Sequence, residues 1–167
     1  MAQSKILISD APAGQGPRSL TPDIAQAWRW IGWFGLVLTL AGLGDWVLAW
    51  FPMRLGAPEW EFGTIVSSFS GLPLVTMGFA ALLGSAVARG VRWQVLVIAW
   101  ALLLWALVIA ACTVIFLLDV PLALGAVQGP ARLGIMKAIA KTLMLAALFG
   151  TGYAVAAIGS LRRAARR

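Results

Sequence analysis

Asp45 is the residue best placed to do chemistry, because it is a carboxylate inside a long apolar segment. A carboxylate at membrane depth is costly, so we expect it to face a helix bundle and to find a polar partner. Lys137 and Lys141, which lie one turn apart near the start of the last apolar segment, are the predicted partners. Two interpretations stay open: a buried ion pair that fixes helix register, and a relay for protons or cations.

A second polar group follows the first apolar segment. Acidic and aromatic residues alternate there, and a basic residue precedes them, in the order Arg54, Glu59, Trp60, Glu61 and Phe62. The pattern predicts either a docking loop for a partner on the outer side of a membrane or a solvated connection. The middle of residues 53–70 is expected to lie along the membrane interface.

The residue types that the chain lacks limit its chemistry. Histidine is absent, and Cys112 is the only cysteine and lies within an apolar segment. These facts exclude His-ligated haem, zinc sites built from His or Cys, and a histidine base. We therefore predict a protein that is not an enzyme and that holds no cofactor or metal.

Composition then defines the elements that must position these residues. The chain has 167 residues, of which 61% are hydrophobic and 11% are charged, far from the balance of soluble domains. Long uncharged segments predict an all-α membrane protein, a bundle of four transmembrane helices with spans at about 30–50, 72–88, 93–118 and 138–161. Thr21-Pro22-Asp23 is a typical helix start, and Asp119 with Pro121 is expected to end the third helix.

The basic residues predict the orientation. Residues 1–21 are expected to be a disordered cytoplasmic tail, residues 22–161 the transmembrane domain and residues 162–167 a basic cytoplasmic tail. Nine of the thirteen Lys and Arg residues lie before the first span, in the second loop or after the last span, which places both termini in the cytoplasm. The high content of Ala, Gly and Arg indicates a bacterial inner membrane. The formal charge of +7 therefore indicates topology and lipid rather than nucleic acid. Predicted contacts with lipid head groups are made by Arg162, Arg163, Arg166 and Arg167.

Small residues recur at spacings of four in two of the predicted spans. Such stripes allow helix backbones to approach closely in lipid. The predicted packing residues are Ala80, Gly84 and Ala88 in the second span and Ala146, Gly150 and Ala154 in the last. A neighbouring face of the last span carries Gly152, Ala156 and Ser160. Packing within the bundle and contact with a separate subunit both stay open.

One stretch of the chain carries a family resemblance. It comprises Phe51-Pro52-Met53-Arg54, Pro58-Glu59-Trp60-Glu61-Phe62-Gly63 and Gly71-Leu72-Pro73-Leu74 with Gly78, roughly 30 of the 167 residues. This pattern resembles the first loop of small membrane proteins of the cyanobacterial HpsJ type. Those proteins are associated with the production or secretion of hormogonium polysaccharide, and the resemblance implies such a role here.

Three functions are therefore predicted. The first is a non-enzymatic accessory or scaffold subunit of a larger respiratory, photosynthetic or envelope-building membrane complex, with lipid and other membrane subunits as partners. The second is a role in polysaccharide export or biosynthesis. The third is a small proton-coupled transporter that uses Asp45.

Overall fold

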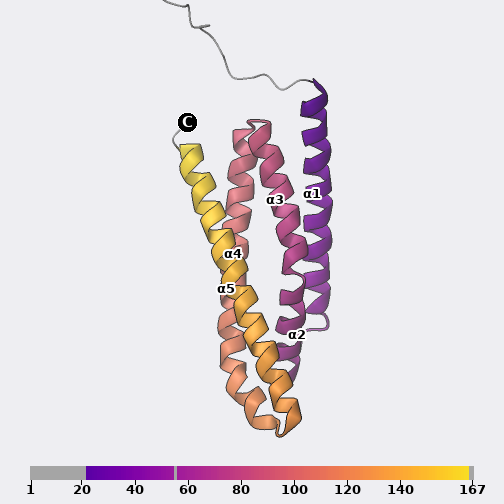
Figure 1. The fold of residues 1–167 in the computed structure, drawn as a ribbon, viewed down its shortest axis with the longest axis vertical. Helices are drawn as coiled ribbons and strands as arrows, with labels where there is room; N and C mark the ends of the chain where they lie inside the picture. Colours follow the sequence, from indigo (N-terminus) through magenta and orange to yellow (C-terminus); the bar gives the residue numbers. More distant parts are fainter. Residues whose placement is uncertain (1–21, 55, 166–167) are drawn as a thin grey trace, which may run out of the picture.

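All regular secondary structure in the described residues is α-helical, which confirms the predicted all-α class. The structure is a computed structural model, and it describes residues 22–54 and 56–165. It contains α1 (Pro22–Ala49), α2 (Pro58–Ser70), α3 (Leu72–Ala88), α4 (Arg92–Ala126) and α5 (Pro130–Ala165) (Figure 1). The predicted tail at residues 1–21 and the arginines Arg166 and Arg167 lie outside the described residues.

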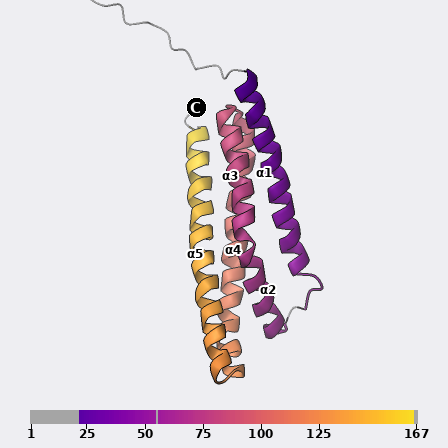
Figure 2. The same cartoon turned by 45° about the vertical axis from the view of Figure 1, so that its right-hand side comes forward.

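The long helices form a row rather than a closed bundle. α1 packs along α3, α3 packs on α4, and α4 packs along α5, whereas α1 does not contact α5. α2 joins α3 end to end at a bend and packs against α4 and α5 (Figures 1 and 2). The start of α1, the α3–α4 turn and the end of α5 share one end of the molecule, here named the terminal end. α2 and the α4–α5 connection lie at the opposite end, here named the α2 end.

Three described helices are long and apolar enough to cross a membrane. They are α1, α4 and α5, with 28, 35 and 36 residues. α3 has 17 residues and is about 26 Å long, slightly less than the ~30 Å hydrocarbon core of a bilayer. α2 and α3 together pass the same test, although they are bent by 41° where they meet. The spans therefore number three, or four if the bent pair counts as one.

Helix ends agree with the sequence in two places and differ in another. α1 begins at Pro22, and α3 covers Leu72–Ala88, as predicted. The prediction that Asp119 and Pro121 end the third helix is wrong, because α4 continues through Pro121 to Ala126. The proline removes one backbone hydrogen bond. Packing of Phe116 and Val120 into the core on the preceding turn offsets that loss.

The segment predicted as a connection along the interface is mostly a helix. α2 has a proline in its first turn and two acids, Glu59 and Glu61, near its positive end. Ile65 and Phe69, four residues apart on one face, are almost completely buried. Local capping and an apolar face therefore both favour helix where composition alone indicates a polar loop.

The core lies around the junction of α2 and α3. The largest side chains with almost no exposed surface gather there and belong to α2, α3 and α4: Ile65, Phe69, Leu72, Val75 and Phe116. The remaining surface of α1, α4 and α5 is mostly apolar and exposed. This distribution is expected for a thin helical assembly whose outward faces contact lipid or other subunits.

α1 and α3 meet through glycines that the sequence analysis did not single out. Gly32, Gly35, Thr39 and Gly42 are the buried residues of α1. A Cβ on Gly35 would lie 2.9 Å from the carbonyl oxygen of Gly78, so the two backbones are in direct contact. Ser85 of α3 also donates a 2.7 Å hydrogen bond to the carbonyl oxygen of Trp28. Small residues at spacings of three and four in α1 were the signal for this interface.

Candidate functional site

Two carboxyl groups meet at the α2 end, where α2 packs on α4. Asp119 is only 7% exposed, and its Oδ2 atom has no hydrogen-bond partner among the described residues. Glu61 of α2 lies close enough to Asp119 for the charges of the two carboxylates to interact. The other contact of Glu61 is local, since its Oε1 accepts a 2.6 Å hydrogen bond from the Gly56 N–H. The Glu61–Asp119 pair therefore brings together two acidic side chains from different helices, with one buried oxygen that has no hydrogen-bond partner among the described residues.

A stacked pair of phenylalanines lies beside these carboxyl groups. Phe62 follows Glu61 directly on α2, and Phe116 lies one turn before Asp119 on α4. Their ring centroids are 5.0 Å apart and the ring planes differ by 22°. Phe116 has no exposed surface, so this stack is fixed by the core. Because residues three apart share a helix face, Asp119 is turned toward α2 together with Phe116.

The pair can hold one positive charge between its oxygens. Two ionised carboxylates in a buried contact repel each other, and a shared proton or a bound cation removes the repulsion. The described residues contain no group of three or more potential Asp, Glu or Cys ligands for a metal ion. The chemistry available to these two residues is therefore proton sharing or a cation held by two carboxylates.

Asp119→Asn is expected to stabilise the protein at neutral pH. The amide removes one of two like charges and donates a hydrogen bond to Glu61, which we expect to raise the free energy of unfolding by about 1 kcal/mol. Denaturant-induced unfolding in detergent micelles measures the change. Glu59→Gln is the matched control, because Glu59 is exposed on the same helix turn as Glu61. Destabilisation by Asp119→Asn would show instead that the site holds a cation through two negative charges.

Asp45 lies beside the break between α2 and α3. It is exposed on α1, and a Cβ on Gly71 would lie 3.6 Å from its Oδ2 atom. Lys137 and Lys141 are also exposed, on the first half of α5. Because α1 and α5 do not contact each other, the structure does not bring Asp45 together with these two lysines. Asp45 instead lies near Gly71, the residue that joins α2 to α3.

The segment predicted to dock a partner is divided between surface and interior. Arg54 and Glu59 are exposed. Trp60 is half-buried and packs edge-on against Trp50, with ring centroids 6.0 Å apart, while Phe62 stacks on Phe116. The alternation of acidic and aromatic residues thus joins α2 to α1 and α4. Only part of this segment is open to a partner.

The predicted packing stripes lie on different kinds of surface. In α5, Ala146 is buried, and a Cβ on Gly150 would meet Ile109 of α4 at 3.5 Å, so this stripe faces α4. Ala154 is half-buried. In α3, Ala80 is exposed and Gly84 has only the ring of Trp28 nearby, at 3.9 Å. Ala88 is half-buried at the end of that helix.

A groove of about 250 Å³ separates α3 from α5 above the floor formed by α4. Its polar feature is a 2.6 Å hydrogen bond between the hydroxyl groups of Thr76 and Tyr153, and Phe79 packs edge-on against the same tyrosine at 6.0 Å. Small residues form part of both walls: Ala80 on α3, and Gly152 and Ala156 on α5. The groove, named here the α3–α5 groove, therefore has small residues on both walls.

Comparisons with known proteins add no relative. No family model matches the chain, and neither the curated proteins nor the solved structures contain a match.

Proposed function

We propose that this chain is a non-enzymatic accessory subunit of a larger membrane complex in a bacterial inner membrane. It crosses the bilayer four times, with α2 and α3 forming one bent span and both termini in the cytoplasm. The even number of spans agrees with the shared position of the start of α1 and the end of α5 (Figure 1). The predominance of arginine over acidic residues at that end supports the orientation.

The α3–α5 groove is the observation that carries this proposal. The hydrophobic effect does not drive helices together within lipid, so their association depends on close approach of the backbones at small residues. Gly152 is exposed on the groove wall, and a Cβ added there would have no atom of the chain within 4 Å. No contact within the chain requires a glycine at this position, so Gly152 is free to pack against a helix of another protein. The occupant we propose is a transmembrane helix of another subunit with small residues along its contacting face.

Gly152→Leu is expected to remove that partner while leaving the chain folded. Tagged protein would be purified from its own host in a mild detergent, and co-purifying proteins quantified by mass spectrometry. The wild type should carry a stoichiometric partner that the variant loses at least tenfold, because the leucine fills the mouth of the groove. Ala147→Leu is the matched control. Ala147 is exposed on the side of α5 opposite to Ala156, which lines the groove.

Other outcomes of this purification contradict the proposal. Equal recovery of the partner with Gly152→Leu would show that the α3–α5 groove is not the docking surface. A wild-type protein that elutes as a homo-oligomer without other subunits would contradict the accessory role. That second result would favour a proton-coupled transporter, for which the position of Asp45 beside a broken helix is the supporting observation.

A further inference from the structure

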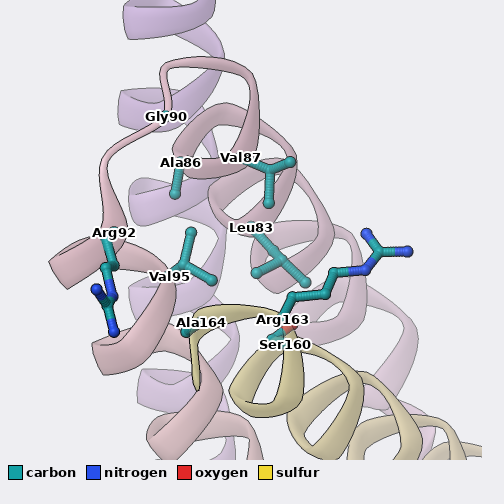
Figure 3. Close-up of a pocket in the computed structure, with 9 residues that line it drawn as sticks. All are labelled: Leu83, Ala86, Val87, Gly90, Arg92, Val95, Ser160, Arg163 and Ala164. Atoms are coloured by element: carbon teal, nitrogen blue, oxygen red, sulfur yellow. The ribbon is translucent and has the colours of Figure 1, made fainter. Parts of the chain in front are cut away.

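A second hollow, of about 140 Å³, lies at the terminal end of the molecule. It is enclosed by the last turns of α3, the first turn of α4 and the end of α5 (Figure 3). Its apolar wall is formed by Leu83, Ala86, Val87, Val95 and Ala164. Gly90, in the left-handed region at φ +68°, makes the tight α3–α4 turn that brings Arg92 next to the end of α3.

Two arginines flank this apolar wall. Arg92 is at the start of α4, and Arg163 is in the last turn of α5 beside Ser160. Figure 3 shows their side chains on opposite sides of the hollow, with the apolar side chains between them. Among the described residues, neither guanidinium pairs with a carboxylate, and both residues are exposed. Arg89 differs, because its guanidinium donates a 2.7 Å hydrogen bond to Gln94.

The surroundings of the hollow are predominantly cationic. The acids of the described chain, apart from Asp23, lie toward the α2 end: Asp45, Glu59, Glu61 and Asp119. The end of a spanning helix is also where arginine side chains meet the phosphates of the bilayer. An anion is therefore favoured here, and the apolar wall favours a ligand that also carries hydrocarbon.

We propose that this hollow is a binding site for an anionic phospholipid. Arg92 and Arg163 hold the head-group phosphates, and an acyl chain lies against Leu83, Val87 and Val95. Basic pockets between transmembrane helices are suited to lipids with more than one phosphate. Because the two guanidinium groups lie on opposite sides, a lipid with two phosphates, diphosphatidylglycerol, matches the site best. This site adjoins the α3–α5 groove, because Leu83 lines both, but the inference does not depend on the accessory-subunit proposal.

Lipid titration of the full-length chain in non-ionic detergent tests the proposal. We expect phosphatidylglycerol to raise the melting temperature, diphosphatidylglycerol at equal phosphate concentration to raise it further, and phosphatidylcholine to leave it unchanged. Arg92→Gln combined with Arg163→Gln should weaken binding about thirtyfold, the equivalent of two basic contacts of about 1 kcal/mol each. Native mass spectrometry should show the corresponding loss of bound lipid.

The matched control is Arg54→Gln combined with Arg132→Gln. It removes the same charge, and both arginines are exposed and do not line the hollow. Val87→Trp is a second variant, which fills the hollow without changing any charge and should also weaken binding. Equal weakening by the control pair, or an equal shift with phosphatidylcholine, would overturn the proposal. A full shift with inorganic phosphate alone would show an anion site without lipid and would overturn it as well.

Discussion

Gly78→Leu is expected to separate α1 from α3 and to lower the free energy of unfolding by roughly 3 kcal/mol, at the upper end of overpacking costs. A Cβ at position 78 would contact the Thr39 hydroxyl and lie 2.6 Å from the Thr39 backbone nitrogen and 3.0 Å from the Gly35 carbonyl oxygen. Two of these three neighbours are backbone atoms, which cannot move without displacing a whole helix turn. The larger leucine side chain therefore cannot fit unless α1 moves away from α3.

Detergent-induced unfolding followed by tryptophan fluorescence measures this loss. Gly44→Leu is the matched control on α1, because a Cβ at Gly44 would have no atom within 4 Å. α1 contacts the rest of the chain mainly through α3, with smaller contacts to α2 and a ring contact between Trp46 and Trp105 of α4. Its detachment should therefore leave most of the packing of α4 on α5 intact. An unfolding midpoint for Gly78→Leu equal to that of Gly44→Leu would show that α1 is not held by this contact.

The sequence predicted elements more reliably than their contacts. Long uncharged segments and the Pro22 start signal predicted helix at the correct places, because both depend on local chain properties. The predicted end of α4 is wrong because Pro121 by itself indicates a helix end. The core packing around Phe116, which keeps the helix intact, is not visible in the sequence. The α1–α3 interface was missed for a similar reason. A glycine signals close approach only when the facing helix is known, and Gly78 was not among the residues of the predicted stripes.

The candidate site shows the same limit. Asp45 is a candidate from the sequence because it is the one carboxylate inside its apolar segment, which can be recognised without knowing any contact. Asp119 was interpreted as a helix terminator and Glu61 as part of a loop, so nothing indicated that the two would meet. Their contact requires α2 to be helical and to place Phe62 on Phe116. The resemblance of residues 51–78 to HpsJ-type proteins stays a prediction.

Phe116→Ala is expected to cost about 3 kcal/mol of unfolding free energy. The side chain has no exposed surface and fills the space between α4 and α2. In a membrane the cost comes mainly from the cavity and the lost contacts rather than from transfer out of water. Equilibrium unfolding in detergent measures it. Leu118→Ala is the control, because Leu118 is 71% exposed on the same helix and should change stability little.

A double-mutant cycle with Phe62→Ala determines whether the stack also positions the carboxyl pair. The two rings should couple by about 1 kcal/mol, as aromatic pairs do. If the stack holds Asp119 against Glu61, then Phe116→Ala should also abolish the stabilisation expected from Asp119→Asn, because the amide no longer reaches its acceptor. Full retention of that stabilisation in the Phe116→Ala background would mean that the carboxyl contact is maintained by the backbones of α2 and α4, and that the aromatic pair contributes packing alone.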